Sequence, residues 1–353
     1  MSINGLRDAI IRGLGFVTLQ YGTIMSRNNC FDLLRLLAAI MVVVYHHAGF
    51  MRIKIFNPSD YLPLESIWVQ IFITISGFLV TKSFMTSKGF DQYLFKRCLR
   101  IFPALILCSF VVVYFILPFW ESNPFGFVFS YKTLYSFVNM AMMHGINISG
   151  VESPYGFQTI VNPPLWTLPY EFMLYIILGV IMLVHRGLAT PVIALFVILF
   201  LVSGFHESFK NAYFYSVNYL ALMKFGINFF VGSIMFLTFS IWNNKKHKAF
   251  IAIISILILF YLSGNKFDLD IVGRMALAAL TIVIGVSFAF KYTSGKFDIS
   301  YGVYIWGWPI QAVIVQCFDL SFYYSLSLSL LVIFIVSFIS RSTVEEYFLK
   351  KKN

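Results

Sequence analysis

The chain alternates long apolar stretches with short polar segments, and the length of the apolar stretches is the first guide to its fold. A hydrophobic run of about 20 residues is long enough to cross the hydrocarbon core of a bilayer as a helix. The pattern predicts an all-α integral membrane protein with about ten transmembrane helices. The predicted spans are residues 31–51, 64–84, 99–118, 166–185, 188–205, 220–241, 248–264, 271–290, 301–318 and 321–340. A further apolar stretch, 131–144, is too short to span and predicts an interfacial or re-entrant segment.

The first predicted span carries charges that an ordinary lipid-facing helix does not carry. Within this apolar run lie Asp32, Arg35 and His46. At about 100° per residue, the eleven steps from Arg35 to His46 return to within roughly 20° of the start, and Asp32 lies within about 40° of His46. One helix face therefore holds an acid, a cation and a base. Ionisable groups inside a span are costly to bury, so this face is a candidate functional site.

Composition supports the membrane assignment. The chain is 59% hydrophobic and 12% charged, with a mean hydropathy of +0.81, which excludes an ordinary soluble globule. The four cysteines are Cys30, Cys98, Cys108 and Cys317. They lie in or beside apolar spans and no two have metal-ligand spacing, so we expect neither a metal site nor a disulfide framework.

The net charge of +11 is compatible with nucleic-acid binding, but the positions of the charges favour a membrane topology instead. With the N-terminus in the cytoplasm, most of the 26 Lys and Arg residues fall in cytoplasmic segments. This bias follows the positive-inside rule, places both termini in the cytoplasm and leaves no need for a nucleic-acid partner. The long segment 119–165 is then external, and its aromatic residues predict either an interfacial belt or an ordered cap over the spans.

The chain ends differ from the membrane region. Residues 1–25 resemble neither a span nor a signal peptide, and predict an extension that is interfacial or lies upstream of a true start at Met25. Residues 26–342 form the predicted transmembrane domain, and residues 343–353 a basic cytoplasmic tail.

His46 is the first candidate for chemistry. It lies about 15 residues from the cytoplasmic end of its span, or roughly 22 Å, which is nearer the outer face. Histidine is suited to proton transfer near neutral pH, although a membrane histidine also serves to pair polar groups between helices. The charged neighbours on the same face favour the functional interpretation. His47 points about 100° away and is the weaker candidate.

Glu171 is the second candidate. It follows the segment Asn162–Tyr170 and lies a few residues inside a span that enters from the outer side, at a depth similar to that of His46. A carboxylate there can hold the tautomer of an imidazole or bind acceptor hydroxyls. The alternative is an acid favoured by the helix dipole. Trp166, at the span entrance, is equally compatible with an interface anchor.

A basic run, Lys96-Arg97-Cys98-Leu99-Arg100, lies at the start of the third predicted span and just before it. Arg97 and Arg100 share a helix face, and two guanidinium groups at that spacing suit a phosphate or pyrophosphate. Ordinary positive-inside charge explains the run equally well. A phosphate site here and a base roughly 20 Å deeper would fit an elongated donor such as coenzyme A.

Five motifs in order resemble the acyltransferase family 3 membrane proteins, especially bacterial O-antigen and polysaccharide O-acetyltransferases. The matching segments are Phe31-Asp32-x-x-Arg35-x-x-Ala38 with His46, Phe72-Ile-Thr-Ile-Ser76-Gly77-Phe78-Leu79, Arg97-x-x-Arg100-Ile-x-Pro103, Leu165-Trp166-x-Leu168-x-x-Glu171-x-x-x-Tyr175 and Ser300-Tyr301-Gly302-x-Tyr304-x-Trp306-x-Trp308-Pro309. One departure is Gly307, where many relatives have His. That position cannot supply a second base in this chain.

The resemblance implies an acyltransferase domain over residues 26–342, with acetyl-CoA as donor and a carbohydrate hydroxyl as acceptor, in the bacterial inner membrane. It implies that His46 is catalytic and that Asp32 and Arg35 support it. The implied donor-contacting residues are Arg97 and Arg100, and we add Lys96, Ser76 and Tyr301 to the donor site. We also add Glu171 as a catalytic residue that orients the imidazole or binds the acceptor, with Trp166 on the acceptor side. Gly77 would allow a helix or a ligand to approach closely.

Two other classes of function remain at this point. Intramembrane His, Asp, Arg and Glu also suit a proton-coupled transporter or a flippase for a sugar or sugar-lipid. The sequence shows no inverted repeat, which such a transporter would often have. A structural scaffold for polysaccharide assembly would leave the charged face of the first span unexplained. Consumption of acetyl-CoA separates the enzyme from both alternatives.

Overall fold

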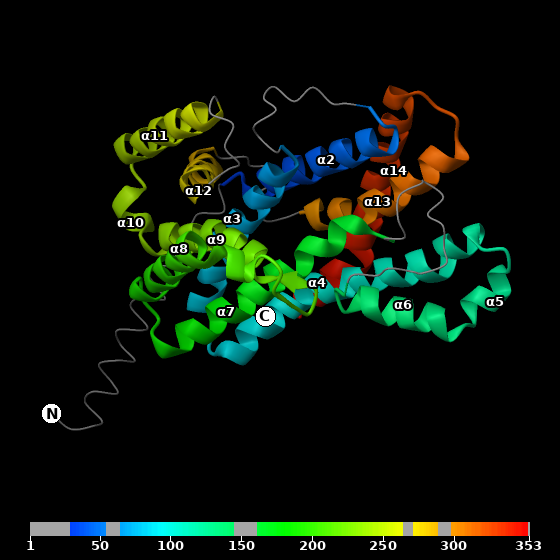
Figure 1. Ribbon diagram of the computed structural model, residues 1–353, viewed down its shortest axis with the longest axis horizontal. Coiled ribbons are helices and arrows are strands. Elements are labelled where there is room, and N and C mark those ends of the chain that lie inside the picture. Colours follow the sequence, from blue (N-terminus) through cyan, green and yellow to red (C-terminus); the bar gives the residue numbers. More distant parts are fainter. Residues whose placement is uncertain (1–28, 54–63, 145–160, 264–270, 289–297, 352–353) are drawn as a thin grey trace.

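A computed structural model describes residues 29–53, 64–144, 161–263, 271–288 and 298–351. The described part of the chain is a bundle of helices, shown in Figure 1, with one antiparallel hairpin whose two strands have two residues each. Seven helical segments are long and apolar enough to cross a membrane. They are Phe31–Phe50, Ser66–Met85, Phe90–Trp120, Pro163–Val184, Ala189–Phe209, Tyr219–Leu237 and Phe322–Lys350. The chain is therefore built as a multi-pass membrane protein.

Three more helices coincide with predicted spans but do not meet the same standard of length and apolarity. They are α11 (Lys245–Ser263), α12 (Ile271–Ser287) and α13 (Ser300–Cys317). α11 begins with a cluster of lysines, α12 is short, and α13 is rich in polar and aromatic residues with an internal proline. The all-α class is confirmed, whereas the count of ten spans and their topology stay predictions.

The centre of the bundle is the contact between α3 (Leu64–Met85) and α9 (Tyr219–Leu237). Two glycines let the helices approach closely, because a Cβ at Gly77 would overlap the backbone of Phe229 and a Cβ at Gly232 would overlap that of Thr74. Small residues at such contacts are typical of membrane helix pairs, where close packing replaces hydrophobic driving force. The absence of a side chain at Gly77 thus allows the backbone of α9 to approach α3 closely.

We expect Gly77→Ala to destabilise the protein, because the added methyl group collides with backbone that has no flexible end to move. Overpacking of this kind typically costs about 1–3 kcal/mol. Thermal unfolding in detergent should show a lower midpoint than for the wild type. Gly204→Ala, in α8 (Ala189–Phe209), is the matched control because no heavy atom lies within 4 Å of its Cβ position. Equal midpoints for the two variants would contradict the packing argument.

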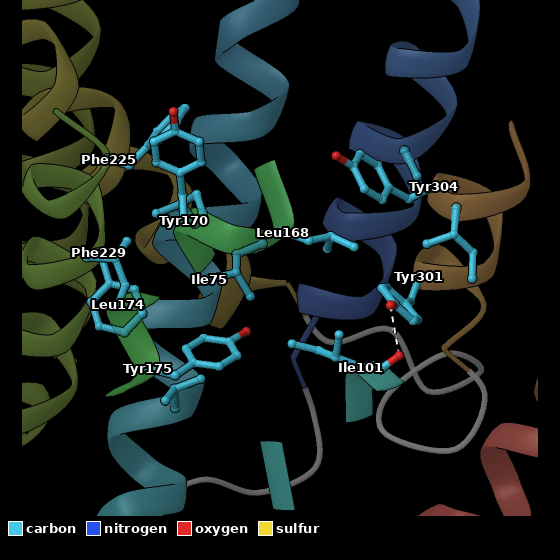
Figure 2. Close-up of a cluster of buried hydrophobic side chains, with 14 of the residues drawn as sticks. Ile75, Ile101, Leu168, Tyr170, Leu174, Tyr175, Phe225, Phe229, Tyr301 and Tyr304 are labelled. Atoms are coloured by element: carbon cyan, nitrogen blue, oxygen red, sulfur yellow. Dashed lines mark hydrogen bonds between the residues drawn. The ribbon is translucent and has the colours of Figure 1, made fainter. Parts of the chain in front are cut away.

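α7 (Leu168–Val184) packs on α3 and α9 and completes the core that supports the site. Figure 2 shows Ile75 of α3, Leu174 and Tyr175 of α7 and Phe229 of α9 gathered on one side, with residues of α13 opposite. α7 is preceded by a short 3₁₀ helix, η3 (Pro163–Thr167). α8 is joined to α9 by the hairpin β1 (Tyr213–Phe214) and β2 (Val217–Asn218). α10 (Phe239–Trp242) links α9 to α11.

α4 (Phe90–Val111) is the longest segment, since η1 (Val112–Ile116) and η2 (Leu117–Trp120) continue it. After α5 (Pro124–Val128), α6 (Tyr131–Ala141) returns along α4, and its Phe137 contacts the rings of Phe110 and Tyr114. The stretch 131–144 is thus a short packed helix, and Figure 1 shows it beside α4. Its outward face is aromatic, with Tyr131 and Tyr135 exposed. The belt and cap interpretations of segment 119–165 both stay predictions.

The C-terminal residues continue the last span. α14 (Phe322–Ser340) leads without a break into a π-helical turn, η4 (Arg341–Glu345), and α15 (Glu346–Lys350). η4 and α15 pack against α4, and the side chain of Glu345 is buried. Residues 343–350, which the sequence placed in a tail, are therefore part of the packed bundle.

Candidate functional site

An acidic residue that the sequence analysis did not select holds the centre of the site. The Oδ2 atom of Asp298 lies 3.1 Å from Nη1 of Arg35 on α2 (Phe31–Phe50) and also accepts a hydrogen bond from Nη2 of Arg100 on α4. Its Oδ1 atom accepts hydrogen bonds from the Ser300 backbone N (2.9 Å) and Oγ (2.5 Å). One carboxylate therefore joins α2, α4 and the start of α13.

Burial raises the pKa of the Asp298 carboxyl. The charges of Arg100 and Arg35 and the hydrogen bonds from Ser300 lower this pKa by more than burial raises it. The net effect holds the pKa well below its usual value, so the group is ionised at neutral pH. The available sequence signal was an acid two residues before the Ser300-Tyr301 motif.

The other basic residues of the run also lie near this cluster. Arg97 donates from Nη2 to Ser83 Oγ at 3.0 Å, and Lys96 Nζ lies 3.5 Å from Ser87 Oγ. The buried Nε atoms of Arg97 and Arg35 have no hydrogen-bond partner among the described residues. Buried donors without partners are uncommon and mark places where a ligand can bind. Guanidinium groups with spare donors fit phosphate oxygens.

Asp32, at the first turn of α2, interacts electrostatically with Arg100. It therefore adds a second acid to the field around this cluster, as the shared face with Arg35 led us to expect. A third acid, Glu345, is 2% exposed, and neither of its carboxylate oxygens has a hydrogen-bond partner among the described residues. The charges of Arg100 and Arg341 both act on it.

Glu171 belongs to a second polar group, between α3 and α7. Its carboxylate accepts hydrogen bonds from Ser76 Oγ and from the Tyr175 hydroxyl, and the two hydroxyls lie 3.4 Å apart. The sequence analysis selected Glu171 and Ser76 separately, and the structure brings them into contact. Tyr175 is one helical turn after Glu171, where its hydroxyl reaches the same oxygen.

A small cavity connects the two polar groups. It has a volume of about 30 Å³ and is lined by Arg35 and Glu171, by Tyr301 and Tyr304 of α13, by Thr167, and by apolar side chains of α3 and α7. This space is enough for a water molecule. A larger ligand requires the lining side chains to move.

One face of α13 runs from the arginines past the cavity to His46. Tyr301 donates to the Ile101 carbonyl oxygen of α4 at 2.9 Å, as Figure 2 shows, and Tyr304 is hydrogen-bonded to Thr167 at 2.6 Å. Trp308 contacts the ring of His46 edge-on, with centroids 5.2 Å apart. These α13 residues are spaced three and seven apart, so they share a face.

His46 and Glu171 make separate sets of contacts. His46 lies about 16 Å beyond Arg35 along α2, and the residues lining the cavity do not include it. Among the described residues, the hydrogen bonds of Glu171 join it to Ser76 and Tyr175, not to the imidazole of His46. His47 is fully buried, with Nε2 2.7 Å from Ser325 Oγ of α14, and so ties two helices together.

Two other positions complete the comparison with the sequence analysis. Trp166 in η3 is half exposed and contacts the rings of Tyr170 and Phe225. At Gly307 an added Cβ would lie 2.9 Å from a methyl group of Val43, so α13 and α2 are too close there for a larger side chain without a shift.

Residues 28–341 match the family model for the acyltransferase domain of acyltransferase family 3. The chain belongs to this family. It is 35% identical over 338 residues to an O-acetyl transferase of Shigella phage Sf6, covering 93% of this chain and 98% of that one. It is also 33% identical over 177 residues to Nodulation protein 10 of Rhizobium leguminosarum bv. viciae, covering 45% of each chain. No solved structure matches.

The family membership and the phage relative identify this protein as a membrane O-acetyltransferase. Acyl transfer to a hydroxyl needs a base for the hydroxyl proton, a site for the acyl donor and dipoles that stabilise the oxyanion. The described residues offer groups suited to each task in this acyltransferase. They are the imidazole of His46 packed on Trp308, the buried arginines around Asp298, and the hydroxyl and guanidinium groups that line the cavity beside those arginines.

Proposed function

We propose that this O-acetyltransferase moves an acetyl group from cytoplasmic acetyl-CoA to a hydroxyl of a cell-surface polysaccharide, such as O-antigen, or of its lipid-linked precursor, across the bacterial inner membrane. The observation that carries the proposal is the order of groups along α2 and α13. Asp298 with its two arginines comes first, the cavity lies next to them, and His46 with Trp308 lies furthest along both helices.

The arginines would bind the phosphates of the donor. Arg97 and Arg100 come from the basic run of α4, and Arg35 reaches the same cluster from α2. The unpartnered Nε atoms of Arg97 and Arg35 in the described structure support this role, because phosphate oxygens would satisfy them. Lys96 would add a more flexible charge at the entrance.

The pantetheine arm would then pass along the α13 face toward His46. Tyr301 and Tyr304 lie on that route, and the cavity beside them would open to admit the arm. In the transfer step, His46 accepts the proton of the sugar hydroxyl while the hydroxyl oxygen attacks the thioester carbonyl. The C–S bond breaks, and the coenzyme A thiolate takes that proton from His46 as it leaves. Formation of an acetyl-imidazole on His46 before sugar attack is an alternative sequence with the same balance.

Glu171 would bind the acceptor rather than orient the imidazole. It lines the cavity, and its observed partners are Ser76 and Tyr175. A sugar hydroxyl that reaches the cavity would find a carboxylate acceptor held in place by two hydroxyl donors. Trp166, half exposed at the entrance to α7, would offer a ring face to a sugar.

We expect Glu171→Gln to lower kcat/KM for the carbohydrate by roughly tenfold to a hundredfold, because a hydrogen bond to a charged group is worth about 1.5–3 kcal/mol. The loss should appear mainly in KM for the carbohydrate, with acetyl-CoA binding unchanged. Tyr175→Phe removes only one donor to Glu171 and should have a smaller effect of the same kind. Wild-type kinetics in Glu171→Gln would contradict the assignment.

The proposal is tested by following coenzyme A thiol release from acetyl-CoA in detergent-purified protein. The acyltransferase predicts thiol release that rises when acceptor polysaccharide is added. A proton-coupled transporter or flippase predicts none, because transport does not consume a thioester. Absence of release by folded protein with either polysaccharide or its lipid-linked precursor would contradict the proposed donor and acceptor.

A further inference from the structure

We propose that Asp298 is an internal anion that occupies the place of a donor phosphate in the donor-free protein and gives way to that phosphate when the donor binds. This inference rests on the proposed use of coenzyme A phosphates by the arginine cluster. Asp298 would then be a positioning residue that sets the donor affinity through Arg35 and Arg100.

The hydrogen bonds around Asp298 carry the first step of the argument. A single oxygen, Oδ2, bridges guanidinium groups from two different helices, at 3.1 Å from Arg35 and in a short contact with Arg100. A phosphate oxygen makes the same type of bridge between arginines. The carboxylate therefore occupies the position in which this cluster would hold an anionic ligand.

Burial supplies the second step. The side chains of Arg35 and Arg100 are each 15% exposed, and that of Asp298 is 11% exposed. A charge removed from water is very unfavourable when its partner is missing. The two arginines therefore need an anion whether or not the donor is present. Asp298 supplies one negative charge, and a phosphate with more charge and more oxygens competes well for the same guanidinium groups.

The third step concerns how Asp298 is held. It precedes α13 and lies outside the helix, and Ser300 at the first turn binds its other oxygen. The side chain of Asp298 can therefore break the contacts that its Oδ2 atom makes with Arg35 and Arg100 without unfolding a helical turn.

The test compares wild type, Asp298→Asn and Asp298→Glu by calorimetric titration with coenzyme A. If Asp298 competes with the donor, Asp298→Asn should bind coenzyme A roughly tenfold more tightly, because one charge-assisted competitor is gone. Asp298→Glu restores the charge and should return the affinity toward that of the wild type. In turnover, Asp298→Asn should show a lower KM for acetyl-CoA. A purely structural role predicts the opposite sign, since misplaced arginines bind the donor less well.

Glu345→Gln is the matched control for removal of negative charge. Glu345 is buried and acts electrostatically on Arg100, yet makes no hydrogen bond to an arginine among the described residues. Its effect on coenzyme A affinity should be clearly smaller than that of Asp298→Asn. Equal tightening in the two variants would show a general field effect and overturn the exchange.

A second variant covers the case in which Asp298→Asn does not fold. Ser300→Ala removes one hydrogen bond that holds Asp298 and should tighten coenzyme A binding by a few fold. Inorganic pyrophosphate should raise its thermal midpoint more than that of the wild type. Unchanged or weaker binding in the folded variants overturns the inference alone, provided that the wild type binds coenzyme A. Failure of the wild type to bind coenzyme A overturns the proposed function.

Discussion

His46→Ala is expected to abolish acetyl transfer while the protein stays folded and still binds acetyl-CoA. A positioned base contributes about 10²–10⁴-fold to such a reaction, and a covalent role would make the loss larger. The fold should survive because the ring of His46 packs edge-on against Trp308 and no hydrogen bond ties it to another described residue. Transfer rates, thermal midpoints and acetyl-CoA affinity measured on one preparation check all parts of this expectation.

His47→Ala is the matched control for this variant. His47 is the next residue, but it is fully buried and bonded to Ser325 of α14. Its loss should lower the thermal midpoint, because a buried hydrogen bond and side-chain volume disappear, while the folded fraction retains transfer activity. Full transfer activity in His46→Ala would refute the assignment of the base. Loss of transfer activity in folded His47→Ala at the same time would point to His47 instead.

The second large effect is expected for Arg97→Ala combined with Arg100→Ala, which should weaken acetyl-CoA binding at least a hundredfold. Each arginine would contribute hydrogen bonds to phosphate of about 1.5–3 kcal/mol, which corresponds to roughly tenfold or more per residue. Coenzyme A lacking its 3′-phosphate should bind the wild type less tightly than coenzyme A does. Calorimetric titration of the purified protein measures both effects.

Arg186→Ala is the control for loss of positive charge outside the cluster. Arg186 follows α7 and stacks over Phe84 at 5.1 Å, and the hydrogen bonds that Asp298 accepts come from Arg35, Arg100 and Ser300 instead. Its replacement should leave acetyl-CoA affinity within a few fold of the wild type. Arg97→Lys with Arg100→Lys keeps the charge where the alanine variant fails to fold, and should still bind less well because the planar fork is lost. Unchanged affinity in a folded arginine variant would remove the donor from this site.

The sequence was sufficient for local relationships within the first span. The helical period placed Arg35 and His46 on one face of the helix. In the structure Arg35 contacts Asp298, which precedes α13, and His46 contacts Trp308 within α13. The same reasoning identified Gly77 as a point of close approach, and the backbone of α9 lies there. These predictions succeeded because helical geometry fixes the direction of side chains a few turns apart.

Contacts between distant segments were beyond the sequence pattern. Asp298 meets Arg35 and Arg100 across 263 and 198 positions of the chain, and Glu171 meets Ser76 across 95. Such pairs depend on which helices are neighbours, which hydropathy does not encode. Asp298 also lay outside every predicted span. An acid outside a span has no special cost of burial, so it is not recognised as functional from the sequence.

Helix ends were misplaced for a related reason. The third span was predicted from residue 99, whereas α4 begins at Phe90 and includes the basic run. Hydropathy marks the part of a helix that lies in hydrocarbon, but the hydrogen-bonded helix continues into the polar interface. The same effect extends the last span from 340 through η4 and α15 to Lys350, which brings Glu345 to the arginine cluster.

The most direct test of the account is transfer of labelled acetyl from acetyl-CoA to carbohydrate by the protein in sealed proteoliposomes. The account predicts alkali-labile label on the polysaccharide or its lipid-linked precursor with wild type, and none with His46→Ala or with the arginine double variant. Folded wild-type protein that binds acetyl-CoA but leaves both carbohydrates unlabelled would contradict it, as would equal labelling by wild type and His46→Ala.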